Sequence, residues 1–265
     1  MHRKKTIIGN WKMHGSSTWN LNTLSQLKSS LEMMEFINIG LCIPYVYLTQ
    51  AKELLEDSMI KIGAQNVSQY NEGAHTGSIS ASMISDIGCD YAIIGHSERR
   101  ALSSETFESA TNRFIQTLEA GLTPIFCVGE KQEERDRGYA NAVVESQLRS
   151  VLGALEKRHI QMLINQKTIF SYEPAWAIGT GVNAAPAEAE KMHQLIRNII
   201  ADIDQNFADA AIIIYGGSMN SKNVHDLLSM ENIDGGLVGR SSINIEEFTN
   251  ICHIANSFEC EGVAN

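Results

Sequence analysis

Residues 168–181 read TIFSYEPAWAIGTG and contain one complete transition from strand to loop. The run Thr168–Tyr172 is apolar and rich in β-branched and aromatic residues, which predicts a short strand. Pro174 cannot continue a sheet ladder, so the strand ends beside Glu173. Small residues and two glycines follow, and Pro186 then opens a helical pattern. The stretch predicts a strand, loop and helix unit with a carboxylate at the strand's end.

The same unit repeats along the chain. Eight short runs bounded by Gly, Asn or Pro predict strands: Thr6–Asn10, Ile39–Ile43, Ile60–Ala64, Tyr91–Ile94, Thr123–Val128, Thr168–Tyr172, Ala211–Tyr215 and Gly236–Val238. Amphipathic stretches between them predict helices, most clearly Ser17–Met34, Glu105–Ala120, Ala140–Leu155 and Pro186–Ile203. Strands that alternate with helices pair in parallel through right-handed crossovers.

Two α/β folds fit this alternation. An open doubly wound sheet usually carries a G-x-G-x-x-G fingerprint after an early strand, and the sequence has none there. Eight units in about 250 residues without a biased linker favour a single-domain TIM (β/α)8 barrel over residues 1–265. Its core is expected at about residues 5–255. Lys157–Gln166 is expected to be a surface connection, and the tail 257–265 a frayed terminus.

The composition limits the possible partners. Hydrophobic residues make up 43% of the chain and the formal net charge is −10. An acidic surface repels nucleic acid, and no run approaches the ~20 apolar residues of a membrane span, so we expect neither partner. The five cysteines are odd in number and form no C-x-x-C pair, which indicates a reduced cytoplasmic protein. We expect no secretory signal, because only a short apolar run follows the basic start.

Polar residues follow the predicted strands at the end where a barrel carries its active site. Lys12 follows the first strand, His96 the fourth and Glu173 the sixth. Glycine turns at residues 216–217 and at Gly239 follow the last two strands, each poised to lead into a helix, and their amides can hold an anion. Alone, each group could be structural, for example a surface lysine or a strand-exit carboxylate. Together they suit an acidic phosphorylated metabolite.

These stretches resemble the triosephosphate isomerase family, from about Lys5 to Ala255. The shared motifs are short, but together they are specific: GNWKM at 9–13, GAQN at 63–66, GHSERR at 95–100, YEPAWAIGTG at 172–181, YGGS at 215–218 and LVG at 237–239. The resemblance implies a homodimer of TIM barrels. It implies an aldose–ketose isomerase that interconverts dihydroxyacetone phosphate and D-glyceraldehyde 3-phosphate, in glycolysis and gluconeogenesis, without cofactor or metal.

The resemblance also implies a role for each site residue by its position. Glu173 would be the base that moves a proton between two carbons, and His96 the electrophile. In this family the histidine stays neutral because a helix N-terminus lowers its pKa. Lys12 would hold the substrate and steady the enediolate, with Asn10 and Glu98 beside it. The phosphate cup would consist of the amides of Gly179, Ser218, Gly239 and Arg240.

A lid and a dimer contact follow from the same resemblance. The segment Pro174–Ala184 would close over the substrate and keep water from the reactive enediol. Trp176 would lie at its hinge, and Tyr215 and Ser218 would latch the closed lid. Thr76, on the long loop after the third strand, would reach a partner subunit.

Several positions depart from the family pattern, among them residues 182–184 at the lid's second hinge. Arg240 stands where the family usually has a second glycine, and a positive φ there would cost about 1–2 kcal/mol. If the guanidinium lies near a phosphate, their attraction would offset this cost. The alternative is that the side chain faces solvent. Arg240→Gly is expected to change KM by less than about tenfold, or about 1.4 kcal/mol, and a larger change would mark a substrate ligand. His14 replaces a usual asparagine, and Ser78 replaces a usual glutamate.

Two other functions are the alternatives. A different phosphate-binding barrel enzyme, such as a Schiff-base aldolase, would need a lysine at the end of the sixth strand, where Glu173 stands. A non-catalytic barrel that only binds partners would be favoured by loss of Lys12, His96 or Glu173, and none of the three is lost.

Overall fold

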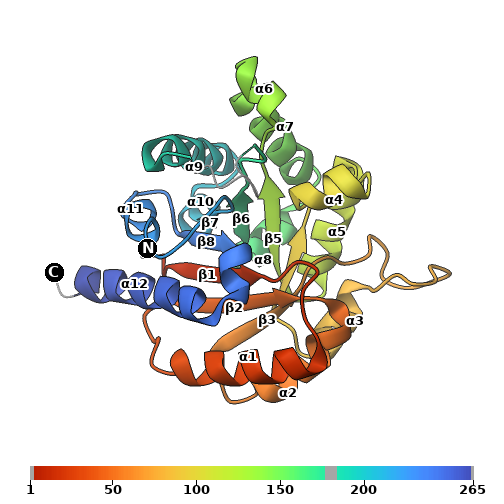
Figure 1. Ribbon diagram of the computed structural model, residues 1–265. Helices are drawn as coiled ribbons and strands as arrows, with labels where there is room; N and C mark the ends of the chain where they lie inside the picture. Colours follow the sequence, from red (N-terminus) through yellow and green to blue (C-terminus); the bar gives the residue numbers. More distant parts are fainter. Residues whose placement is uncertain (1–2, 177–183, 264–265) are drawn as a thin grey trace.

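The protein forms a closed barrel of eight parallel strands, in a computed structural model that describes residues 3–176 and 184–263 (Figure 1). The strands are β1 (Thr6–Asn10), β2 (Asn38–Ile43), β3 (Ile60–Ala64), β4 (Tyr91–Ile94), β5 (Thr123–Val128), β6 (Ile169–Tyr172), β7 (Ile212–Tyr215) and β8 (Gly235–Val238). They pair in sequence order, and β8 closes the barrel against β1. The predicted fold is confirmed, and every predicted strand lies within one residue of its observed bounds.

Helices surround the barrel (Figure 1). They are α1 (Ser17–Ser30), α2 (Leu48–Leu54), α3 (Ala81–Asp86), α4 (Ser97–Leu102), α5 (Phe107–Glu119), α6 (Gln132–Asp136), α7 (Ala140–Leu152), α8 (Lys157–Gln166), α9 (Pro186–Ala201), α10 (Gln205–Ala210), α11 (Val224–Leu228) and α12 (Ile245–Val263), with short 3₁₀ helices η1 (Tyr45–Tyr47) and η2 (Arg240–Ile243). The four long predicted helices are all present, and each ends one to four residues before its predicted end.

Two predictions about the connections are wrong. Lys157–Gln166 is not an irregular connection but helix α8, because His159 and Leu163 lie one turn apart and are both buried. The segment 257–265 is not a frayed tail over most of its length, since α12 extends through it. Phe258 packs against the hydrophobic core there and holds this end of α12 in place.

The buried side chains divide into two layers because alternate residues of a strand face opposite sides of the sheet. One cluster fills the barrel interior and includes Ile8, Ile93 and Ile125. The larger cluster lies between barrel and helices and includes Ile7 and Phe126. The interior is therefore packed, and a site can form only in the loops at the strand ends.

None of the helices within residues 3–176 and 184–263 combines the length and the apolar character that crossing a membrane requires.

Candidate active site

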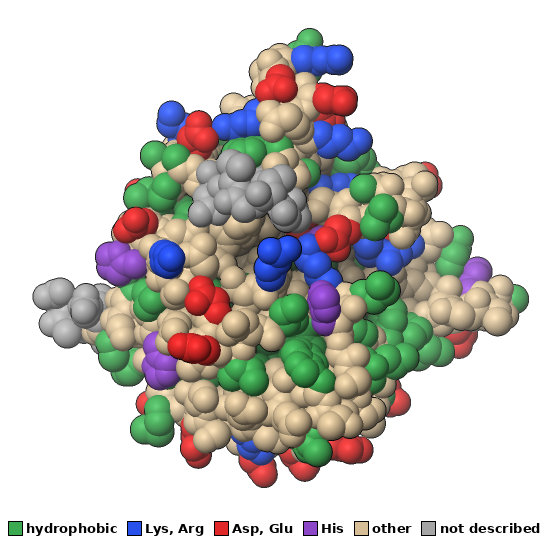
Figure 2. Space-filling model, viewed as in Figure 1, with side chains coloured by type: hydrophobic (Ala, Val, Ile, Leu, Met, Phe, Trp, Pro, Cys, Tyr) green, Lys and Arg blue, Asp and Glu red, His purple; other side chains and the backbone are tan. Residues whose placement is uncertain are grey.

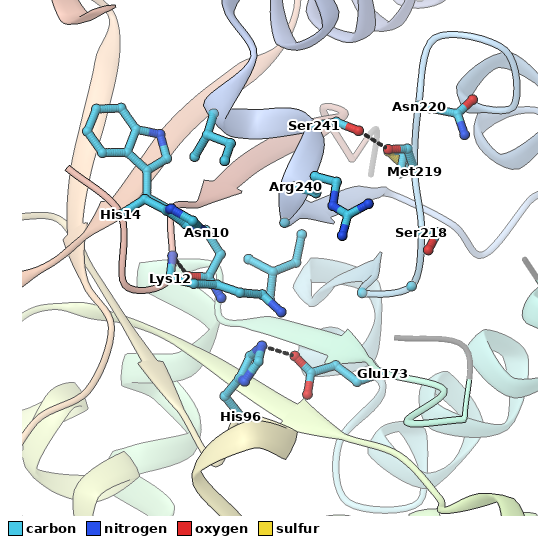
Figure 3. Close-up of a pocket in the computed structure, with 16 residues that line it drawn as sticks. Asn10, Lys12, His14, His96, Glu173, Ser218, Met219, Asn220, Arg240 and Ser241 are labelled. Atoms are coloured by element: carbon cyan, nitrogen blue, oxygen red, sulfur yellow. Dashed lines mark hydrogen bonds and ion pairs between the residues drawn. The ribbon is translucent and has the colours of Figure 1, made fainter. Parts of the chain in front are cut away.

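A pocket of about 470 Å³ opens where the loops after β1, β4, β6, β7 and β8 meet. Lys12, His96 and Glu173 all line it, as do Asn10, Ser218, Gly239 and Arg240 (Figure 3). Figure 2 shows Lys and Arg side chains gathered near the centre of this face, where β1 and β8 lie in Figure 1. The structure therefore brings together residues that follow the first and the last strands of the barrel, such as Lys12 and Arg240.

Glu173 is a completely buried carboxylate at the floor of the pocket. Its Oε2 accepts a hydrogen bond of 2.9 Å from the backbone N–H of Ser97. Its Oε1 lies 3.2 Å from Nε2 of His96, but without the alignment of a hydrogen bond, so this oxygen is buried and unpaired. A buried acceptor that lacks a donor gains most from a proton, and Oε1 is thus the basic oxygen.

The strand exit that positions Glu173 depends on Gly129, which directly follows the neighbouring strand β5. The N–H of Glu173 donates to the carbonyl of Val128 at 2.7 Å. A Cβ at Gly129 would lie 1.7 Å from the carbonyl oxygen of Glu173, closer than any side chain allows. The close approach of these two backbones fixes where the carboxylate leaves β6.

His96 forms the N-cap of α4 and faces Glu173 across the pocket (Figure 3). Its Nδ1 accepts a hydrogen bond of 3.2 Å from the backbone N–H of Glu98. A ring nitrogen that accepts from an N–H carries no proton, which assigns the neutral ring's proton to Nε2. The imidazole therefore presents an N–H donor to the pocket.

Lys12 has a left-handed backbone, with φ of 53°. This conformation costs a non-glycine residue about 1–2 kcal/mol, so neighbouring contacts must hold it. Its N–H donates to Oδ1 of Asn10 at 3.0 Å, and its carbonyl accepts from the Gln65 side chain at 2.8 Å. Its ammonium pairs with Glu98. Asn10, Gln65 and Glu98 together position the cation.

Gln65 is a site-supporting residue to which sequence reasoning gave no role. Its amide nitrogen also lies 3.1 Å from the carbonyl of Cys42, and it bridges the ends of β1 and β2. The signal was present, because Gln65 lies within the GAQN motif at 63–66, but a motif does not reveal which backbone groups a side chain reaches.

Ser218, Gly239 and Arg240 lie on the side of the pocket formed by the last two strands. A Cβ at Gly239 would lie 3.4 Å from Cε of Lys12, so this peptide adjoins the lysine. Arg240 begins η2 and has no left-handed φ, so the strain considered for this position is absent. Only the β8 turn leads directly into a helix; the next helix after β7, α11, begins at Val224. Gly179 lies outside the described residues.

Each described end of the predicted lid is held by a hydrogen bond, one close to the end of β5 and the other at the end of β7. Nε1 of Trp176 donates to Oε1 of Glu130 at 2.9 Å, and the Arg135 guanidinium lies 4.5 Å from the tryptophan ring centroid. At the other end, the N–H of Ala184 donates to the Tyr215 hydroxyl at 3.3 Å. Pro174 precedes the first anchor, and residues 177–183 lie outside the described part of the chain.

Glu130 was not predicted as part of this region. It is completely buried and also accepts from the Tyr172 hydroxyl at 3.1 Å. Its position shortly after the β5 end is visible in the sequence, but position alone does not show that the carboxylate is buried.

Thr76 is not brought to the pocket of its own chain. It lies on the exposed loop between β3 and α3, which extends away from the barrel (Figure 1). Within residues 3–176 and 184–263, no group of three or more His, Cys, Asp or Glu side chains is arranged to hold a metal ion.

Comparisons with known proteins agree on one family. A family model described as "Triosephosphate isomerase" matches residues 5–255. A triosephosphate isomerase of Thiobacillus denitrificans is 43% identical over 253 residues, which cover 96% of this chain and 99% of that protein. One from Thermus thermophilus is also 43% identical, over 96% and 99% of the two chains. The crystal structure of a Bartonella henselae triosephosphate isomerase has a TM-score of 0.85 at 29% identity, covering 95% and 98%.

Proposed function

Since the chain belongs to the triosephosphate isomerase family, which interconverts dihydroxyacetone phosphate and D-glyceraldehyde 3-phosphate, we propose that Glu173, His96 and Lys12 carry out this glycolytic reaction here. The observation that carries the proposal is the unpaired Oε1 of Glu173, buried opposite a histidine N–H and beside a lysine. A base, an electrophile and a cation in one pocket are the groups that proton transfer next to a carbonyl requires.

Glu173 acts as the base. Oε1 takes the proton from the carbon next to the substrate carbonyl, and the electrons of that C–H bond become the C=C bond of an enediolate. The same carboxyl group then returns the proton to the adjacent carbon, which converts ketose into aldose. The Ser97 N–H holds Oε2 and leaves the buried, unpaired Oε1 for the substrate.

His96 and Lys12 stabilise the charge that this transfer creates. The Nε2–H of neutral His96 donates to the substrate oxygen on which negative charge develops. The Lys12 ammonium supplies a positive charge in the same pocket. Its ion pair with Glu98 and the hydrogen bond from the Lys12 N–H to Asn10 fix its position before substrate arrives. Donors that are already oriented need no reorganisation during the reaction.

The phosphate binds at the far side of the pocket, at the peptides of Ser218, Gly239 and Arg240, with Gly179 added from the lid. No hydrogen bond among the described backbone groups uses the N–H of Arg240, so this donor is available. The lid closes between its anchors at Trp176 and Ala184 and excludes water from the enediolate.

We also propose a homodimer in the cytoplasm. Three large apolar side chains in the segments that follow β1, β2 and β4 are strongly exposed, namely Met13 (94%), Val46 in η1 (80%) and Leu102 at the end of α4 (85%). These segments flank the extended loop that carries Thr76, and exposed apolar groups on one side of a protein mark an interaction surface. The partner subunit would cover them. Sedimentation at several protein concentrations tests this proposal, and a monomer at micromolar concentration would refute it.

The activity itself is tested by a coupled assay with D-glyceraldehyde 3-phosphate, in which the dihydroxyacetone phosphate formed is reduced and followed by absorbance. We expect turnover without any added metal. A purified, folded protein with no turnover would contradict the proposed function.

A further inference from the structure

Arg240 has a second group at the phosphate side of the pocket besides its backbone amide. Its exposed side chain lines the pocket and extends across the mouth toward the loop of Ser218 and Asn220 (Figure 3).

The charge of Arg240 is not neutralised by neighbouring groups. Lys12 is the other lysine or arginine that lines the pocket, and its charge is compensated by the ion pair with Glu98. The side chain of Arg240 makes no ion pair or hydrogen bond with any residue in the described ranges, including the other pocket residues. An arriving anion therefore meets one uncompensated cation, at the mouth.

An uncompensated cation at this place has a large effect because the rest of the protein is acidic. The chain carries a formal net charge of −10, and the pocket floor holds the Glu173 carboxylate. A triose phosphate is itself a dianion near neutral pH, so the protein as a whole repels its substrate. Local positive charge at a pocket mouth raises the local concentration of an anion and its association rate.

We propose that the Arg240 guanidinium captures the substrate phosphate: it attracts the dianion to the mouth and pairs with it as the phosphate enters the cup. Its planar fork of N–H donors matches two phosphate oxygens, which a lysine ammonium does not do as well. The backbone at Arg240 permits this side chain without strain, because its φ is not left-handed. The inference rests on the proposed phosphate cup and adds a residue to it.

The test compares the parent protein with Arg240→Gln and Arg240→Lys as ionic strength is varied, because capture by charge shows in the salt dependence of kcat/KM even where KM itself changes by less than about tenfold. Charge attraction extends about 30 Å at 0.01 M salt but only about 3 Å at 1 M. We expect Arg240→Gln to lower kcat/KM for D-glyceraldehyde 3-phosphate about three- to tenfold at 0.01 M and less than about twofold at 1 M. The dissociation constant of inorganic phosphate should weaken in parallel, with Arg240→Lys between parent and Arg240→Gln.

Lys157→Gln is the matched control, because it removes the same charge from an exposed position on α8, outside the pocket. It should follow the parent at every salt concentration. The inference is overturned if Arg240→Gln equals the parent at 0.01 M salt, or if Lys157→Gln reproduces its loss. A parent protein without isomerase activity would refute the proposed function instead, and calorimetric titration with inorganic phosphate would still decide the role of Arg240.

Discussion

The backbone N–H of Ser97 donates to Oε2 of Glu173 at 2.9 Å, while Oε1 of the same carboxylate is buried and unpaired. The first residue of α4 thus leaves the carboxylate one free basic oxygen, and the N-cap of the same helix, His96, presents its Nε2 3.2 Å from that oxygen. A single helix N-terminus therefore orients both groups of the proposed proton transfer.

The strained backbone of Lys12 should depend on Gln65. Gln65→Ala removes the side-chain donor to the Lys12 carbonyl, whereas the Cys42 carbonyl still accepts from the Trp11 N–H at 3.0 Å. We expect the unfolding free energy to fall by about 1–3 kcal/mol, the usual cost of unpaired buried groups. Displacement of the ammonium should lower kcat about 10- to 100-fold. Chemical denaturation and the coupled assay measure the two effects.

Gln50→Ala is the control for this change, since the Gln50 side chain also links two elements, α2 and α1, but lies outside the pocket. Its kcat should match that of the parent. An unchanged kcat in Gln65→Ala would show that the left-handed conformation of Lys12 holds without this support.

Glu130 should control the lid through Trp176. Glu130→Ala removes the acceptor of the Trp176 indole and of the Tyr172 hydroxyl and leaves both donors unpaired. Changes at a lid hinge alter kcat and KM together, so we expect kcat/KM to fall at least about tenfold. The tryptophan fluorescence should shift as well, because the indole loses a buried carboxylate. Glu130→Gln keeps an acceptor and should retain most of the activity.

Arg135 pairs with Glu130 at 3.4 Å and with the exposed Glu188 at 3.0 Å. Glu188→Ala therefore separates the contribution of Glu130 to the lid from that of Arg135. It should leave rate and fluorescence near the parent values. If it reproduced the effect of Glu130→Ala, the arginine rather than the buried carboxylate would anchor the lid.

Stability should depend on pH through His193. The side chain is fully buried between Tyr172 and Tyr215, and burial lowers the pKa of His193 below its ordinary value of 6.5, although Asp234 and Glu190 oppose this. Between the two pKa values the unfolded chain binds a proton that the folded chain does not, so stability falls as pH drops below 6.5. His193→Phe should lose less of its Tm than the parent between pH 7.5 and pH 5.

His225→Phe is the comparison for this experiment, because the His225 side chain is 66% exposed. Its Tm should fall with pH as the parent's does. A parent Tm that does not change over this range, or an equal fall in His193→Phe, would contradict the role assigned to the buried histidine.

The sequence was sufficient for the barrel because the evidence for it is local. β-branched runs and turn residues fix each strand, and parallel pairing follows from the alternation, so strands such as β3 and β5 were predicted with their observed bounds. Helix α8 was missed because it is only ten residues long, too short for its helical pattern to repeat over several turns. The C-terminal end of α12 was missed because its packing partners are distant in sequence.

The sequence was sufficient to predict which residues meet in the site, but not which neighbouring residues hold them in position. Lys12, His96 and Glu173 follow strands, and a barrel must gather such residues at one face. The left-handed Lys12, the contacts of Gln65 and the burial of Glu130 depend on tertiary geometry that spacing does not encode. A positive φ at Arg240 was considered because glycine was expected there, but the backbone of Arg240 is not left-handed.

The central claim is that Glu173 is the base, and Glu173→Gln with Glu173→Asp tests it most directly. Gln keeps the size and the acceptor for the Ser97 N–H but removes the charge, and Asp withdraws the carboxylate from the substrate. We expect kcat to fall by ~10²–10⁴, as for a positioned acid–base group, while inorganic phosphate binds almost as before. A kcat at the parent value in either variant would contradict the account.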